Sequence, residues 1–359
     1  MLSKCFADMP DVEITAVCDR EEKRMNEAVS ALKEKGKKSP YCTSDYKQIL
    51  ADDSIDAVVI MTGWSTHISI AKASVLAGKY TAVEVGCAYD IQECHELIAA
   101  YETTEAPLMM LENCCYGRRE MMALNLLEKG LLGEIVHCKG AYCHYLPEAD
   151  LFYDIDNPVT HYRIGEYINR NCEQYPTHEL GPISKVLWIN RGNRMVKLTS
   201  IASKSRGLKA YAEAHLPSDS PYNHVEYKQG DIVNTCITCA NGETILLTLD
   251  TTLPRPYYSR DFTVRGTKGM YTEERKVLYF EGQEEGQNIY NNEEEAFTKY
   301  DHPLHEEYSK LEVKGGHGGM DWLVCRAFVE SVKRGINTPI DAYDTVTWMS
   351  IASLSEMSI

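Results

Sequence analysis

Short apolar runs separated by helix-like segments fill the first third of the chain. Each run has the length and composition of a strand buried on both faces of a parallel sheet, and we predict strands at residues 12–18, 57–62, 80–85 and 107–111. A helix after the second strand is predicted to be capped by Ser65 and to end at Gly78. Asp90 and Glu93 have the spacing of a capping box, which predicts a helix over 91–101. Strands and helices that alternate in this way form βαβ units with right-handed crossovers.

After about residue 113, strand patterns follow one another without intervening helices. Strands are predicted at 135–144, 196–203, 233–238, 244–250, 262–265 and 270–273. Tight turns at 241–242 and 266–269 join neighbouring strands, so this part is expected to be an antiparallel sheet. The acid-rich stretch 281–295 is predicted to be a solvated loop, and 322–334 a helix that ends in two cations before Gly335.

Composition and charge narrow the class of protein. With 44% apolar and 25% charged residues, the 359-residue chain has the composition of a globular protein of two domains. Its net charge of -16 disfavours binding to nucleic acid, and no apolar run is long enough to cross a membrane. Thirteen cysteines, an odd number, favour a reducing compartment, so we expect a cytoplasmic protein. An exported or periplasmic location is the alternative if a signal segment precedes Met1.

A metal site is not expected. His137, Cys143 and His144 lie on one predicted strand, but alternation sends Cys143 and His144 to opposite faces. The chain also has no H-E-x-x-H sequence. We therefore predict no metal ligands.

One acid occupies a position typical of dinucleotide binding. Asp19 ends the first predicted strand, where an acid usually binds the ribose hydroxyls of the cofactor, about 20 residues after a glycine loop. The chain carries no such loop before Asp19, and residues 1–7 have the pattern of the middle of the helix that follows it. The first strand and the glycine turn, about 15–20 residues, are therefore expected upstream of Met1.

Five sequence motifs together resemble one enzyme family. They are LENCCYGR at 111–118, GAY at 140–142, YPTHELGP at 175–182, DTTLPRPY at 250–257 and GGHGGMD at 315–321. With these motifs the sequence resembles the Gfo/Idh/MocA oxidoreductases and, more narrowly, the family 109 glycoside hydrolases. The resemblance implies hydrolysis of terminal N-acetylgalactosamine with a tightly held NAD that is regenerated in each turnover. Sugar dehydrogenases of this fold usually carry Glu-Lys-Pro where this chain has Glu84-Val85-Gly86, which disfavours a dehydrogenase that uses that lysine.

The same resemblance fixes the expected fold class, α/β plus α+β. Residues 1–113 are expected to form an NAD-binding Rossmann-like domain, truncated at its amino end. Residues 114–359 are expected to form a substrate and oligomerisation domain around an open antiparallel β-sheet of Gfo/Idh/MocA type. Self-association through the open face of that sheet is a further expectation.

The resemblance assigns the catalytic roles to Tyr142 and His178. Tyr142 matches the tyrosine that lies over the sugar and is the expected base at C2, and His178 is expected to handle the C3 hydroxyl proton or the water. These two roles could be exchanged. Arg163 is a candidate for the cation that favours the Tyr142 phenolate. If 175–181 is helical, Tyr175 lies one turn before His178 on the same face.

The resemblance also implies positions for the sugar and the cofactor. The expected sugar-binding residues are Glu112, Arg163, Tyr175, Tyr257 and His317. The expected cofactor-binding residues are Asp19, Thr62, His67, Glu84 and Asn113, and the helix that begins near Thr62 suits a phosphate. Packing of Tyr142 on its strand, a helix-terminal position for His178 and a surface ion pair for Arg163 are the structural alternatives.

The chain offers no convincing pair of carboxylates for ordinary glycoside hydrolysis, which favours a redox route. If NAD takes hydride from C3, the ketone acidifies the C2 hydrogen, a base removes it, and the anomeric substituent is eliminated. Water then adds and NADH reduces C3 again. The alternatives are a sugar or inositol dehydrogenase that releases NADH, and a non-catalytic fragment that binds a sugar or nucleotide. The expected partner is a carbohydrate.

Overall fold

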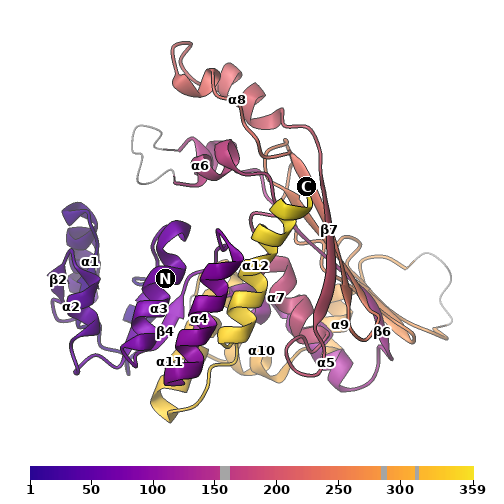
Figure 1. Ribbon diagram of the computed structural model, residues 1–359. Helices are drawn as coiled ribbons and strands as arrows, with labels where there is room; N and C mark the ends of the chain where they lie inside the picture. The colour runs from indigo at the N-terminus through magenta and orange to yellow at the C-terminus, as the bar shows by residue number, and fades with distance from the viewer. Residues whose placement is uncertain (154–161, 284–288, 312–314) are drawn as a thin grey trace. The chain divides into compact units, whose positions relative to one another are not determined.

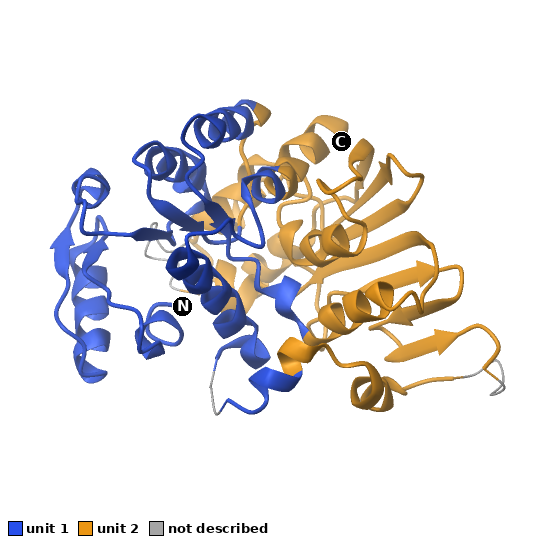
Figure 2. Ribbon diagram, turned by 90° about the horizontal axis from the view of Figure 1, so that it is seen from below, with its two compact units in different colours: residues 1–85, 92–117, 306–346 blue, residues 86–91, 118–305, 347–359 orange. Residues whose placement is uncertain are grey.

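A computed structural model describes residues 1–153, 162–283, 289–311 and 315–359 (Figure 1). The chain forms two compact units, coloured separately in Figure 2. Unit 1 comprises residues 1–85, 92–117 and 306–346, and unit 2 comprises 86–91, 118–305 and 347–359. The predicted domains, 1–113 and 114–359, differ from these units mainly because residues 306–346 belong to unit 1.

Unit 1 contains two small parallel sheets. In one, β1 (Ala16–Cys18) pairs with β2 (Tyr41–Thr43); in the other, β4 (Tyr80–Val83) lies between β3 (Ala57–Ile60) and β5 (Leu108–Met110). All four predicted strands are present, each shorter than its apolar run. The sequence did not predict β2, because Tyr41 is 57% exposed and the strand has no buried apolar run.

The helices wholly within unit 1 are η1 (Phe6–Asp8), α1 (Glu22–Glu34), α2 (Tyr46–Leu50), α3 (Trp64–Leu76), η2 (Asn113–Tyr116), η5 (His317–Gly319) and α11 (Met320–Arg334). Residues of α4 (Ile91–Thr104), α10 (Pro303–Tyr308) and α12 (Ala342–Ser358) are assigned to both units.

The cap prediction for α3 is wrong, since Gly63 is its N-cap and Ser65 lies in its first turn. Residues 1–7 form turns and the start of η1 rather than a longer helix. The predicted end of α11 at Gly335 is confirmed.

Unit 2 is built on a seven-stranded sheet in the order β12-β11-β10-β6-β9-β8-β7. Its strands are β6 (Ile135–Cys143), β7 (Met195–Ala202), β8 (Ile232–Cys239), β9 (Thr244–Asp250), β10 (Thr263–Gly266), β11 (Gly269–Thr272) and β12 (Val277–Phe280). The sheet is mixed rather than purely antiparallel, because β6 and β9 run parallel. No hairpin joins these two strands, and several helices and strands separate them in sequence, so nothing local sets an antiparallel pairing.

The helix α7 (Thr177–Val186) packs against β6 of this sheet. The other helices wholly within unit 2 are α5 (Arg118–Glu128), η3 (Pro147–Leu151), α6 (Tyr162–Asn169), α8 (Gly207–His215), η4 (Pro221–Asn223) and α9 (Glu293–Tyr300). Figure 1 shows α7 beside the sheet, and residues of β8 alternate between buried and exposed, as expected for a sheet with one open face. Of the predicted loop 281–295, residues 284–288 lie outside the described residues and Glu293–Glu295 begin α9, whose acidic first turn suits a helix amino end. Among the described residues, every helix is too short or too polar to cross a membrane.

The contact between β6 and α7 is unusually close at Gly140. A Cβ atom at Gly140 would lie 2.5 Å from the Cβ atom of Glu179 and 3.1 Å from Cδ1 of Ile183. Glu179 is buried, so its backbone has little room to move away. Only a residue without a side chain therefore lets α7 reach the strand.

We predict that Gly140→Ala lowers the free energy of unfolding of the protein by about 1–3 kcal/mol, because the added methyl group forces α7 away from β6. Gly165→Ala is the matched control, since a Cβ atom there meets no atom within 4 Å in α6. Urea unfolding of both variants checks the prediction. Equal stability of the two variants would contradict the close contact.

Candidate active site

Three predicted residues of unit 2 meet in one aromatic cluster. The Tyr142 ring on β6 lies 4.5 Å from the Tyr175 ring and 5.6 Å from the His178 ring, and the last two rings are 4.8 Å apart, measured between centroids. Both tyrosines are buried. The helical spacing expected for Tyr175 and His178 is wrong, because α7 begins at Thr177. The turn before the helix nevertheless brings the two rings together.

Two residues that the sequence did not single out for this site complete the cluster. The phenol oxygen of Tyr142 lies 3.2 Å from Nδ1 of His144, and the Tyr258 ring packs edge-on against Tyr142 at 6.1 Å and against His144 at 5.3 Å. His144 was considered only as a metal ligand, although its position two residues after Tyr142 on a strand puts both on one face. Tyr258 directly follows Tyr257, which is the tyrosine that the family resemblance pointed to.

Arg163 places a cation beside this cluster. Its guanidinium carbon lies 5.0 Å from the centroid of the Tyr175 ring, and the same group pairs with Asp150 of η3. Burial works against the charge, but Tyr175 and Tyr142 more than offset it and raise the pKa of Arg163 well above its usual value. Arg163 therefore stays charged next to the two phenols.

Tyr257 lies apart from the cluster. Its side chain is 63% exposed, and its ring contacts the guanidinium of Arg255 at 5.3 Å. Nε of Arg255 also donates to the Tyr257 carbonyl oxygen, and Arg255 pairs with Asp250 at the end of β9. Of the neighbours Tyr257 and Tyr258, it is Tyr258 whose ring packs against Tyr142.

In unit 1, Asp321 connects two predicted residues. Its carboxylate accepts a hydrogen bond of 2.6 Å from Nδ2 of Asn113 and one of 2.9 Å from Nδ1 of His317. His317 is 71% exposed and has a φ of 49°, within a glycine-rich turn. A Cβ atom at Gly316 would lie 2.3 Å from Oδ2 of Asp321, so a side chain there would force the Asp321 carboxylate to shift. Asp321 was not among the predicted site residues, although it ends the GGHGGMD motif four residues after His317.

Two further acids belong to the same unit. Glu112 is fully buried, and its Oε1 accepts the backbone N–H of Cys114 at the start of η2. Glu84 directly follows β4. Burial raises the pKa of Glu84 to about 7, and the neighbouring carboxylates of Glu112 and Asp321 add to that increase. Glu84 is therefore partly protonated near neutral pH.

The remaining predicted cofactor residues lie at the carboxyl ends of β1 and β3. Oδ1 of Asp19 accepts the backbone N–H of Glu21. The Thr62 hydroxyl accepts a hydrogen bond of 2.7 Å from Thr66, and its carbonyl accepts one of 2.7 Å from Nε2 of the fully buried His67. Burial lowers the pKa of His67 to about 4, so this ring is neutral and closes the turn into α3. A carboxylate after β1 and a helix that begins after β3 fit the ribose and phosphate groups of a dinucleotide.

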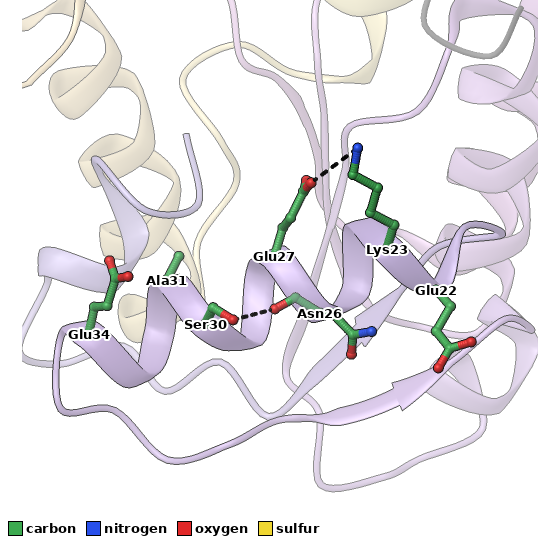
Figure 3. Close-up of a pocket in the computed structure, with 7 residues that line it drawn as sticks. All are labelled: Glu22, Lys23, Asn26, Glu27, Ser30, Ala31 and Glu34. Carbon is green, nitrogen blue, oxygen red and sulfur yellow. Dashed lines mark hydrogen bonds and ion pairs between the residues drawn. The ribbon is translucent and has the colours of Figure 1, made fainter. Parts of the chain in front are cut away.

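A separate hollow of about 650 Å³ runs along α1 (Figure 3). Seven residues of this one helix line it: Glu22, Lys23, Asn26, Glu27, Ser30, Ala31 and Glu34. Three carboxylates against one lysine would repel the phosphates of a dinucleotide. The hollow contains none of the predicted site residues, and we do not assign the cofactor to it.

We predict that Glu84→Gln removes a pH-dependent loss of stability. Because the pKa of Glu84 is raised from 4.5 to about 7 in the folded protein, the stability that its neutral form provides is lost as the pH rises through about 7. Between about pH 5 and pH 8 the wild type should lose roughly 2–3 kcal/mol relative to the variant. Urea unfolding at both pH values tests this, with the exposed Glu22→Gln as control. Parallel pH profiles for wild type and Glu84→Gln would contradict it.

Comparison with known families covers nearly the whole chain. The family model described as "Oxidoreductase family, NAD-binding Rossmann fold" matches residues 2–112, and the model of the "Glycosyl hydrolase 109, C-terminal domain" matches residues 116–359. The first match confirms the predicted Rossmann-like domain and NAD as its cofactor. The second covers well over half of the chain.

Individual proteins give the same result. A "Glycosyl hydrolase family 109 protein" of Stenotrophomonas maltophilia is 37% identical over 100% of this chain and 83% of its own length. An "Alpha-N-acetylgalactosaminidase" of Tannerella forsythia is also 37% identical, over 88% of this chain and 70% of its own length.

Solved structures share the fold at low identity. A levoglucosan dehydrogenase in complex with NADH and levoglucosan aligns with a TM-score of 0.71 and 18% identity over 97% of this chain and 88% of its own. An NAD-binding oxidoreductase from Klebsiella pneumoniae aligns with a TM-score of 0.73 and 16% identity over 99% of this chain and 91% of its own. These likenesses confirm the fold class of the Gfo/Idh/MocA oxidoreductases, and the family matches show that the chain belongs to glycosyl hydrolase family 109.

Proposed function

We propose that this protein hydrolyses glycosides of terminal N-acetylgalactosamine and uses NAD as a recycled redox cofactor. The observation that carries the proposal is the cluster of Tyr142, Tyr175 and His178 beside the Arg163 cation. It supplies a phenol, an imidazole and a fixed positive charge within one unit. Membership of family 109 supports a glycosidase, and the substrate is suggested by the relative named alpha-N-acetylgalactosaminidase.

The residues of unit 1 are suited to hold the cofactor. Asp19 would bind ribose hydroxyls, and the turn at Thr62 would meet phosphate oxygens. Glu84 and Asn113 follow β4 and β5, at the carboxyl edge of the sheet where ligands of such folds bind. When bound, NAD supplies the exchange of hydride with C3 of the sugar, which acidifies the hydrogen on C2.

Tyr142 is assigned the C2 proton. A free phenol has a pKa near 10, so a tyrosine acts as a base only where its anion is stabilised. The charged Arg163 beside Tyr175 and Tyr142 provides such stabilisation. His178, on the neighbouring helix, is assigned the proton of the C3 hydroxyl or of the incoming water.

The remaining assigned residues hold the sugar. Tyr175 and the partly exposed Tyr258 offer ring faces and edges for its apolar face, and Arg163 and Tyr257 offer polar groups from unit 2. Glu112 and His317 were the other two residues predicted to bind the sugar. A dehydrogenase is the competing function, and the valine that follows Glu84 counts against one that relies on a lysine at that position.

One assay separates these functions. Incubation with NAD and nitrophenyl α-N-acetylgalactosaminide in heavy water should release nitrophenol, place deuterium at C2 of the sugar and produce no net NADH. Net NADH would favour a dehydrogenase. Nitrophenol release without deuterium would contradict elimination, and an inactive chain that binds no NAD would favour a sugar- or nucleotide-binding fragment.

We predict that Tyr142→Phe lowers kcat for nitrophenol release by about 10²–10⁴-fold, the usual contribution of a proton-transfer group. Tyr145→Phe is the matched control, because Tyr145 lies three residues away and packs against Tyr211 instead. Steady-state kinetics of both variants measure the effect. A kcat of Tyr142→Phe equal to that of the control would remove Tyr142 from the reaction.

A further inference from the structure

His144 is held in a fixed place beside the phenol of Tyr142. The backbone N–H of His144 donates to the Asp250 carbonyl of β9. The preceding residue, Cys143, exchanges two backbone hydrogen bonds of 3.1 Å with Ser259 on the other side. Backbone hydrogen bonds therefore hold the end of this strand on both of its edges. The 3.2 Å contact between Oη of Tyr142 and Nδ1 of His144 joins two side chains of this anchored segment.

The chemistry of the two groups suggests a direction for the proton. A phenol O–H donates a hydrogen bond and an imidazole nitrogen without a hydrogen accepts one, so with Nδ1 of His144 free of a hydrogen the phenol is the donor in this contact. The groups that face this pair from the packed elements are Tyr175, His178, Tyr258 and Arg163, the last paired with Asp150. Arg163 is the fixed cation among them, and it favours an anion on the phenol oxygen.

We propose that His144 is the proton partner of Tyr142, a positioning residue that takes the phenol proton on Nδ1 and so turns Tyr142 into the base that acts at C2. This inference rests on the proposed function. The O–H bond of Tyr142 breaks as an N–H bond forms on His144. The phenolate oxygen then takes the C2 hydrogen as a proton. The electron pair of the C2–H bond becomes the C1–C2 double bond, and the bond from C1 to the leaving oxygen breaks with its electron pair. The leaving oxygen takes a proton from solvent and His144 releases one to solvent, which restores the neutral imidazole.

The packing of Tyr258 supports this role. Its ring contacts both members of the pair edge-on and limits rotation of the His144 ring away from the phenol. A histidine that only filled space would not need its Nδ1 atom directed at a phenol close to the half-buried Arg163 cation.

His144→Asn tests the proposal most directly. The asparagine amide oxygen occupies nearly the position of Nδ1 and accepts the phenol hydrogen bond, but it does not take up a proton near neutral pH. His137→Asn is the matched control, since His137 is on the same strand and bonds Thr244 instead. For each variant, kcat and KM would be measured across pH with the nitrophenyl glycoside and with its C2-deuterated form. His144→Ala would be assayed with and without added imidazole.

We expect His144→Asn to lower kcat about 10²-fold with KM changed by less than about twofold, to increase the isotope effect of C2 deuterium, and to remove the decline of kcat at acid pH. Imidazole should restore His144→Ala, more strongly as the pH rises and more imidazole is neutral.

A His144→Asn enzyme with wild-type kcat and an unchanged acid limb would overturn the proton partner while leaving the glycosidase intact. An equal loss at every pH without imidazole rescue would also overturn it, because a purely structural residue behaves in that way. A wild type that neither releases nitrophenol nor exchanges the C2 hydrogen would overturn the proposed function itself. The melting temperature of each variant shows whether it is folded.

Discussion

The site in unit 2 depends on the close contact between α7 and β6 at Gly140. With no side chain there, the Cβ atom of Glu179 occupies the space in which a Cβ atom of residue 140 would stand. Tyr142 lies two residues further along the strand, and His178 directly precedes Glu179 on the helix. The same contact that packs the helix therefore sets the 5.6 Å separation of the two rings assigned to catalysis. Since β6 is bonded to β10 and β9 on its two edges, the strand is the fixed partner.

Charge is arranged differently in the two units. In unit 2, Arg163 contributes a cation next to several phenols, which favours their anionic forms. In unit 1, burial raises the pKa of Glu84 to about 7, and the nearby carboxylates of Glu112 and Asp321 add to that increase. The acids there are held by hydrogen-bond donors, such as Asn113 and His317 on Asp321. The charged groups of each unit are thus tuned by neighbours within that unit.

The sequence predicted those features that have a local signal. Apolar runs located β3, β4 and β5, and the motif around 175–182 located Tyr175 and His178, whose rings do meet Tyr142. Features that depend on distant partners were missed. The parallel pairing of β6 with β9 involves no tight turn that the sequence could reveal, and β2 contains no run of buried apolar residues.

Among the site residues, the missed ones act through another side chain. Asp321 is recognised only when Asn113 and His317 are seen to share its carboxylate, and Tyr258 only when its neighbour Tyr257 is seen to face Arg255. Strand alternation places His144 on the same face as Tyr142. Its proposed role, however, follows from the short distance between its Nδ1 atom and the phenol oxygen, which sequence spacing does not give. Sequence motifs identify groups that could touch a substrate more readily than the groups that position them.

A glycosidase without a pair of carboxylates needs a base strong enough to remove a proton from carbon. Ketone formation at C3 would lower the basicity required, and the surroundings of Tyr142 would lower the cost of making its anion. Two neighbours contribute in different ways: Arg163 acts as a fixed charge that stabilises the anion, and His144 as an acceptor that removes the proton. A cation alone would leave the phenol proton without a destination, and an acceptor alone would leave the anion unstabilised. Both are present around one phenol, which is why the proposed chemistry assigns the C2 proton to Tyr142 and not to His178.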